Sequence, residues 1–166
     1  MIKITTERSE HAAAIENLLD EAFGADRHAK VSYSFRVAID RLMPLCLVAL
    51  EDEALAGTIR YWPIEIGTAP SLLLGPVAVD GCRRNEGLGG RLIECSLDRA
   101  KTLGYRSAVL VGDEAYYGRV GFKPIPKGRA TMPGPVDYGR LLVAELVDGA
   151  FDKVSGAIRP DWSFAR

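Results

Sequence analysis

The residues Arg84-Asn85-Glu86-Gly87-Leu88-Gly89-Gly90 stand between an apolar run, Leu72–Val79, and a segment of helical periodicity, Gly87–Leu103. Glycines let backbone N–H groups approach a ligand closely. The start of a helix adds N–H groups without a partner in the helix, together with a partial positive charge. The stretch therefore predicts a site for a phosphate or pyrophosphate. A glycine-rich helix start that binds nothing is the alternative.

Two familiar phosphate-binding loops do not fit this stretch. The dinucleotide-binding fingerprint G-x-G-x-x-G can begin at Gly87 and Gly89, but Leu92 occupies the place of the third glycine. The P-loop ends in G-K-[ST], and here Gly90 is followed by Arg91. Neither a Rossmann dinucleotide site nor a P-loop nucleotide site is therefore predicted.

The segments around this loop predict a mixed sheet. Apolar runs over 44–50, Leu55–Ile66 and Leu72–Val79, separated by turns, indicate an antiparallel meander. Gly104 ends the helix, and the apolar, β-rich run Ser107–Val111 follows it. A strand, a helix and a strand joined by so short a crossover predict a parallel βαβ unit.

The two ends of the chain show weaker patterns. A short strand is expected over Met1–Thr5, and apolar residues at helical spacing predict a helix that ends at Gly24. A second helix is expected over residues 26–41, and a strand over Leu141–Leu146. Residues 123–135 are rich in Gly, Pro and Lys and show no regular period.

Composition limits the class of protein. The chain has 166 residues, of which 48% are hydrophobic and 26% are charged, which is typical of a soluble protein. This length predicts a single domain over residues 1–166. No apolar run approaches the roughly 20 residues that span a bilayer, and the first residues do not resemble a signal peptide. We therefore expect a cytoplasmic protein with no membrane association.

The net charge argues against a nucleic-acid-binding protein, and the small number of cysteines and histidines argues against a metalloprotein. The net charge is -1, and residues 83–106 carry six basic against three acidic side chains, so no nucleic-acid partner is expected. Three cysteines without C-x-x-C spacing and two histidines favour neither a disulfide framework nor a metal site. No metal cofactor is expected.

Two motifs, in this order and spacing, resemble the GNAT superfamily of N-acetyltransferases. Val77-Ala78-Val79 followed by Arg84-x-x-Gly87-x-Gly89 is similar to its acetyl-CoA signature, Q/R-x-x-G-x-G/A after an apolar strand. Tyr116-Tyr117-Gly118-Arg119-Val120-Gly121-Phe122 resembles its aromatic-Tyr-x-x-x-Gly-Phe segment. The resemblance covers about residues 2–146 and extends to a bacterial subgroup of predicted N-acetyltransferases.

The resemblance implies a fold and a co-substrate, acetyl-CoA. The implied fold is α/β (α+β), with flanking helices and a mixed central sheet whose parallel strands splay apart around the βαβ unit. The strand residues that would contact the pantetheine arm are Val77, Ala78 and Val79, with the oxyanion held by an amide of Val77 or Ala78. The residues whose backbone amides would hold the pyrophosphate are Arg84, Asn85, Glu86, Gly87, Leu88, Gly89 and Gly90.

The implied reaction is direct transfer of the acetyl group to a primary amine of a small molecule or peptide. By resemblance, Tyr117 is the general acid that protonates the leaving CoA thiolate. The alternative is a core tyrosine with a satisfied hydroxyl. The general base stays open among four candidates, which are Glu65, Asp113, Glu114 and His28.

Two segments and one alternative hypothesis bear on the substrate and the activity. By resemblance, the acceptor amine would lie between residues 24–35 and 123–140, but neither segment carries a dominant charge. A non-catalytic acyl-CoA-binding or sensing module on the same fold is the second hypothesis, because a fold does not fix a function. Monomer and homodimer are both open.

Overall fold

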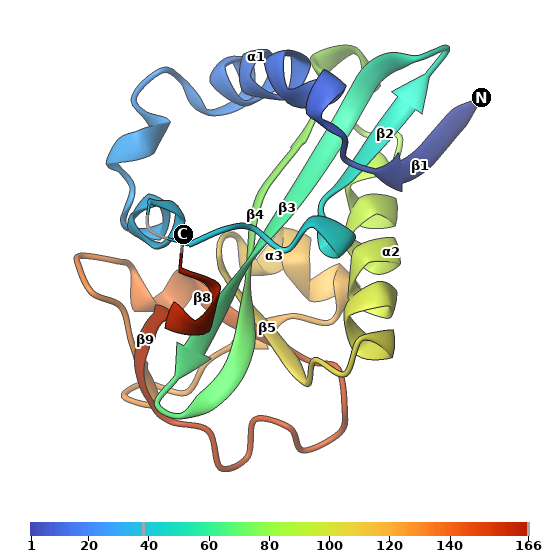
Figure 1. Cartoon of the computed structure of the whole chain (residues 1–166). Coiled ribbons are helices and arrows are strands. Elements are labelled where there is room, and N and C mark those ends of the chain that lie inside the picture. Colours follow the sequence, from blue (N-terminus) through green and yellow to red (C-terminus); the bar gives the residue numbers. More distant parts are fainter. Residues whose placement is uncertain (38, 166) are drawn as a thin grey trace.

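The sheet is built on the predicted meander. In the computed structural model, which describes residues 1–37 and 39–165, β2 (Leu47–Glu51), β3 (Ala54–Ile66) and β4 (Ala69–Val79) pair antiparallel in that order (Figure 1). Apolar and aromatic residues fill long runs of these strands, as expected for strands covered on both faces. The other elements pack against this frame.

The remaining elements extend the sheet and cover its faces. β1 pairs with β2 at one edge, and β5, β8 and β6 follow β4 at the other, so the order is β1-β2-β3-β4-β5-β8-β6. β9 pairs with β3 and with β7. Their bounds are β1 (Ile2–Thr6), α1 (Ala12–Phe23), α2 (Leu88–Thr102), β5 (Ser107–Val111), α3 (Glu114–Tyr117), β6 (Lys123–Pro124), β7 (Ala130–Thr131), β8 (Leu141–Glu145) and β9 (Gly156–Pro160).

The predicted parallel unit is confirmed. β4 and β5 are parallel neighbours joined through α2, and their register places Leu72 opposite Ala108 and Leu73 opposite Val109. The other neighbours in the order from β1 to β6 are antiparallel, whereas β7 and β9 pair in parallel. The fold class expected from the sequence, a mixed sheet with a parallel pair and flanking helices, is therefore confirmed.

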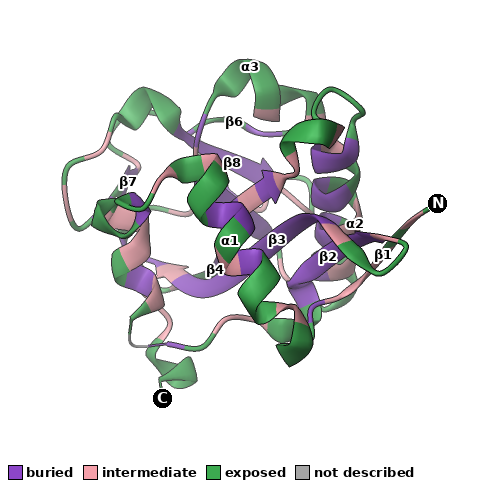
Figure 2. Cartoon of the chain, turned by 90° about the horizontal axis from the view of Figure 1, so that it is seen from above, coloured by how far each residue is buried: buried purple, intermediate pink, exposed green. Residues whose placement is uncertain are grey.

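The two long helices lie on opposite faces of the sheet. Leu47 and Ala49 of β2 pack in the same apolar core as α2, whereas Val48 and Leu50 pack in the core that contains α1. This division follows from the strand period of two, which sends successive side chains to opposite faces. Seen from above, α1 lies across the sheet with its outer side exposed (Figure 2).

β4 carries one extra residue in its middle. Ile59 pairs with Val77, but Tyr61 pairs with Leu74, so two steps along β3 correspond to three along β4. This β-bulge changes which face a side chain meets, and Leu74 and Val77 both pack against the core of α2. Gly75 lies in the bulge with a φ of 136°, a conformation open mainly to glycine.

Two parts of the chain differ from the expectation. The helix expected over 26–41 is wrong: the segment forms 3-10 turns at Arg27–Ala29 and Val31–Arg36, and residue 38 lies outside the described residues. Serine, tyrosine and valine in this segment have low helix propensity, so local preference does not hold a full helix. β9 was not expected, because its short sequence has no clear strand period.

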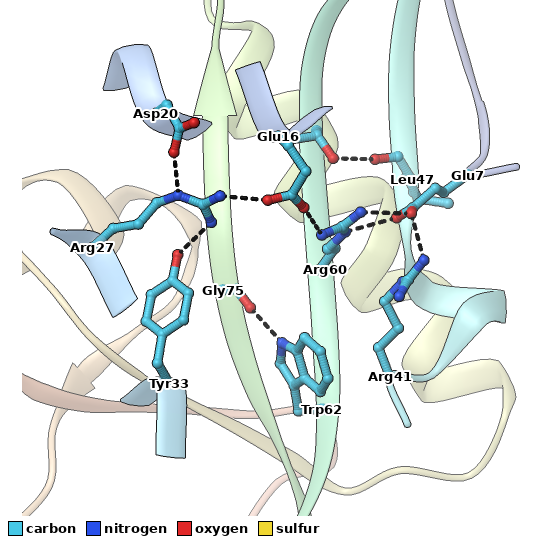
Figure 3. Close-up of polar contacts among 11 residues, drawn as sticks. Glu7, Glu16, Asp20, Arg27, Tyr33, Arg41, Leu47, Arg60, Trp62 and Gly75 are labelled. Atoms are coloured by element: carbon cyan, nitrogen blue, oxygen red, sulfur yellow. Dashed lines mark hydrogen bonds and ion pairs between the residues drawn. The ribbon is translucent and has the colours of Figure 1, made fainter. Parts of the chain in front are cut away.

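Ion pairs attach the N-terminal segment to the middle of the sheet (Figure 3). Arg60 of β3 donates two hydrogen bonds to the buried Glu7 carboxylate, at 3.0 and 2.8 Å, and one to Glu16 of α1 at 3.1 Å. Arg41 donates a further bond to Glu7 at 2.8 Å. Burial would lower the pKa of Arg60, but these carboxylates outweigh it and raise that pKa above its ordinary value.

Arg27 extends these contacts to the segment after α1. Its buried guanidinium contacts Glu16 and donates to Asp20 at 2.9 Å and to the Tyr33 hydroxyl at 3.0 Å. Burial raises the pKa of Glu16, but the two arginines that bind it leave that pKa below its ordinary value. We call these six side chains the ion-pair cluster: Glu7, Glu16, Asp20, Arg27, Arg41 and Arg60.

Glu7→Gln should lower the free energy of unfolding by about 3–5 kcal/mol, because it removes a buried carboxylate charge from two guanidinium groups. Glu10→Gln is the matched control: it removes one partner of an exposed ion pair with Arg8, which is worth less than about 1 kcal/mol. Urea denaturation measures both. Equal stability of the two variants would show that the cluster does not hold this segment on the sheet.

Candidate active site

β4 and β5 separate after two residue pairs. Their register ends at Leu73 and Val109, and from Leu74 to Val79 the described residues pair β4 with β3 alone. The edge of β4 that faces β5 is therefore open along this stretch. An extended chain can add to such an edge through main-chain hydrogen bonds.

The open stretch of β4 presents backbone more than side chains. The Trp62 indole donates a hydrogen bond to the Gly75 carbonyl at 2.9 Å, which holds the bulge near the beginning of the stretch. Val77 and Val79 are half-buried against the core of α2, and Ala78 is buried on the side of α1. Their side chains point to the two faces, so the edge between them is main chain.

The helix start after this strand is accessible. Nothing described lies within 4 Å of the position that a Cβ would take at Gly87 or Gly90. Gly87 has a φ of 75°, which turns the chain into α2. The exposed residues here are Arg84, Asn85, Glu86 and Gly87, followed by the buried Leu88 and Gly89 and the half-buried Gly90. The exposed chain from Arg84 to Gly87 and the open space at Gly90 therefore leave room for an anion at the start of α2.

Unlike Gly87 and Gly90, Gly89 is closely packed against neighbouring side chains. A Cβ there would overlap the Tyr116 hydroxyl and would lie 3.6 Å from the Val79 side chain. The absence of a side chain at this position therefore makes room for Tyr116. This contact joins the start of α2 to α3.

Tyr117 is fixed by its neighbours at the end of α3. Its ring meets Tyr116 and Phe122 edge-on, at centroid distances of 4.9 and 6.1 Å, and a Cβ at Gly112 would overlap it. Burial raises the pKa of Tyr117 to about 12, with a further rise from Tyr116 and an opposing effect of Arg140. The phenol therefore carries its proton at neutral pH.

Tyr117 borders the opening between β4 and β5. We call the space here the central cavity, which has a volume of about 110 Å³ and is lined by Leu73–Val77, Leu110, Val111, Arg36 and Tyr117 among others. The edge of β4 that has no strand partner and the tyrosine expected to be the general acid therefore meet at one cavity.

Two larger cavities adjoin it. The tyrosine cavity, about 470 Å³, lies between Lys30–Ser32, Gly112–Asp113 and Pro135–Asp137, and also reaches Tyr117. The arginine cavity, about 440 Å³, is lined by Arg27–Val31, Tyr33, Ser34, Arg36, Arg60 and Trp62 among others. Parts of both segments expected to border the acceptor amine, 24–35 and 123–140, line these cavities.

The four candidates for the general base lie in different parts of the structure. Asp113 lines the tyrosine cavity, where its carboxylate accepts a hydrogen bond from the Ala115 amide at 3.2 Å, and Glu114 is exposed beside it. His28 lines the arginine cavity. Glu65 forms an ion pair with Arg159 at 3.2 Å and is not among the described residues that line the three cavities.

The sequence did not single out three residues at these cavities. The guanidinium of Arg36 lies 4.0 Å from the ring centroid of Tyr33 and 5.5 Å from that of Trp62. Arg36 ends a 3-10 turn and Trp62 lies within β3, so no local motif connects them. The fold brings these segments together, and a single sequence does not reveal their contact.

The described residues offer no cluster for a metal. Within 1–37 and 39–165, no group of three or more His, Cys, Asp or Glu side chains is arranged to hold an ion. Over the same ranges no helix has the length and apolar character to cross a bilayer. Cys46, Cys82 and Cys95 are free thiols.

Known proteins share this sequence pattern. The profile of the acetyltransferase (GNAT) family matches residues 12–122. The uncharacterized N-acetyltransferase YhbS of Escherichia coli strain K12 is 30% identical over 158 residues, which cover 93% of each chain. The uncharacterized N-acetyltransferase YjhQ of the same strain is 27% identical over 134 residues, 78% of this chain and 73% of that one.

Solved structures share the fold. The crystal structure of YhbS from Escherichia coli in complex with CoA has a TM-score of 0.81 at 29% identity and covers 99% of this chain and 92% of that one. A GNAT family acetyltransferase from Brucella melitensis, in complex with acetyl-CoA, has a TM-score of 0.62 at 32% identity. It covers 92% of this chain and 99% of that one. Fold, open strand edge and family match define an acetyltransferase, and the chain belongs to the GNAT family. Within that family it is an N-acetyltransferase similar to YhbS.

Gly112→Ala should lower the free energy of unfolding by about 1–3 kcal/mol, because the new methyl group must displace the Tyr117 ring and meets Leu110 at 3.0 Å. Gly118→Ala is the matched control, since a Cβ there has nothing described within 4 Å. Urea denaturation compares them. A Gly112→Ala protein as stable as the control would mean that residue 112 does not fix Tyr117.

Proposed function

We propose that the chain transfers an acetyl group from acetyl-CoA directly to a primary amine of a small molecule or peptide. The observation that carries this proposal is the open edge of β4 over Leu74–Val79, with Tyr117 beside it. Two similar proteins contain CoA or acetyl-CoA in their crystal structures, which supports the choice of donor.

The proposed binding site for acetyl-CoA is formed by backbone groups. The pantetheine arm pairs with the main chain of Val77 to Val79, as an added strand would. The pyrophosphate is held by amides of Arg84 to Gly90, where the helix start is accessible and partially positive. Neither interaction needs a particular side chain at these positions.

The proposed reaction has three requirements. The amine must be neutral to attack the thioester carbon, although a free alkylamine has a pKa of about 10. The amide of Val77 or Ala78 donates a hydrogen bond to the developing oxyanion. As the C–S bond breaks, Tyr117 gives its phenolic proton to the sulfur, and the proton lost by the attacking amine passes to a base or water. A tyrosine with a pKa of about 12 retains the proton that it must donate.

We also infer that residues 1–166 act as one domain, as a monomer or a homodimer. Three apolar cores pack against the same sheet, which supports a single unit. We assign the protein to the cytoplasm, where free thiols such as Cys46, Cys82 and Cys95 stay reduced.

Tyr117→Phe should lower kcat for acetyl transfer by about 10²–10⁴-fold, because it removes the proton donor, and should leave the Kd for CoA unchanged. Acetyl-CoA consumption with a panel of amines and calorimetric titration with CoA measure the two quantities. Tyr105→Phe, at a tyrosine outside the described lining of the cavities, is the control.

Three results would contradict parts of the proposal. Unchanged turnover in Tyr117→Phe would remove this residue from the reaction. Tight CoA binding by the wild-type chain without turnover of any amine would favour the non-catalytic acyl-CoA-binding module. Absence of CoA binding would exclude both.

Gly90→Glu should weaken CoA binding at least about tenfold, because it places a carboxylate at the helix start that would hold the pyrophosphate. Gly90→Ala is the matched control, because its methyl group enters open space and adds no charge. Titration with CoA at low salt measures both Kd values. Equal affinity of the two variants would place the pyrophosphate elsewhere.

A further inference from the structure

The arginine cavity contains a positive charge without a protein counter-ion. Within the ion-pair cluster three carboxylates face three guanidiniums, so the cluster is neutral. Arg36 lines the same cavity, and none of the described carboxylates lies within ion-pair distance of it. Its Nε is buried and has no hydrogen-bond partner. Of the three described guanidiniums that line this cavity, those of Arg27, Arg36 and Arg60, that of Arg36 therefore lacks a carboxylate partner.

Stacking holds this guanidinium in place. The Tyr33 ring lies 4.0 Å from it and the Trp62 ring 5.5 Å, so aromatic groups cover the guanidinium. Nη2 lies 3.4 Å from the position of a Cβ at Gly75, in the bulge of β4. A guanidinium held by its face keeps its in-plane N–H groups available to a ligand.

The surroundings of Arg36 favour an incoming anion. Burial lowers the pKa of Arg36 to about 10; Tyr33 opposes this, and Arg60 and Arg27 add to it. Glu16, the carboxylate among the described lining of this cavity, is already bound by those two arginines. Lys30 also borders the cavity, but it is exposed and its charge is solvated. A ligand carboxylate would supply the missing charge.

We propose that Arg36 binds a carboxylate of the acceptor, so that the substrates are amines that also carry a carboxylate, such as amino acids and short peptides. This inference rests on the proposed acetyl transfer. Arg36 lines the central cavity together with Val77 and Tyr117, so one small acceptor can place its carboxylate at Arg36 and its amine at the transfer site. The planar fork of arginine matches a carboxylate with two parallel hydrogen bonds.

The test uses substrates that differ in one group. α-, β- and γ-amino acids and dipeptides are each compared with the corresponding carboxamide, with kcat/KM as the readout. We expect the acids to be favoured by about 10–100-fold, the range of a charge-assisted hydrogen bond. Arg36→Met, which keeps an unbranched side chain between the rings, should remove this preference by lowering kcat/KM for the acids by about 10–100-fold more than for the carboxamides.

Two further variants control for folding. Arg106→Met changes an exposed arginine outside the described lining of the cavities and should keep the preference. Arg36→Lys keeps the charge but loses the fork, so it should retain part of the preference. Calorimetric titration of the CoA complex with the N-acetylated acids and their carboxamides gives a binding readout that does not depend on turnover.

The outcomes separate this inference from the proposed function. Acetylation of amines with no advantage for acids, or a preference that survives in Arg36→Met, would overturn the role of Arg36 and leave the acetyl transfer intact. Selective binding of acids that Arg36→Met abolishes, without turnover of any amine, would support the anion site and overturn the acetyl transfer. If the acids show neither selective binding nor a higher kcat/KM than the carboxamides, this inference is overturned.

Discussion

The early separation of β4 from β5 is the constraint on which the candidate active site depends. Pairing along the full length of both strands would satisfy the backbone of β4 internally and would leave no edge for a ligand. Here the parallel ladder stops after Leu73, the bulge at Gly75 follows at once, and Tyr117 lies against Gly112 where the gap begins. The sheet thus leaves the β5-facing edge of β4 without a strand partner over the described stretch Leu74–Val79.

Charged side chains determine the structure around the arginine cavity. Removing an ion from water is costly, and the cost is offset only where opposite charges and hydrogen bonds match it. The ion-pair cluster meets this condition and attaches both Glu7 and α1 to Arg60 in β3. Arg36 alone among these arginines has aromatic neighbours in place of carboxylates. Charge balance therefore distinguishes a structural guanidinium from one available to a ligand.

How much of this could be predicted from the sequence depended on how local the signal was. The βαβ unit, the strand Ser107–Val111 and the end of α1 at Gly24 follow from neighbouring residues and were predicted. The 3-10 turns after α1 and the pairing of β9 with β3 depend on distant contacts and were not. At the site, the motif residues around Tyr117 were found, whereas the contact of Arg36 with Trp62 joins segments that are distant in the sequence and was not.

The contact between Tyr116 and Gly89 also links two positions that are far apart in the chain. The hydroxyl of one residue occupies the volume in which the other would carry its first side-chain atom. A methyl group at position 89 is therefore compatible with this packing only if the ring at position 116 rotates away or loses its hydroxyl. The side chain that position 89 can carry therefore depends on the position of the ring at residue 116, which couples the helix start sterically to the tyrosine segment.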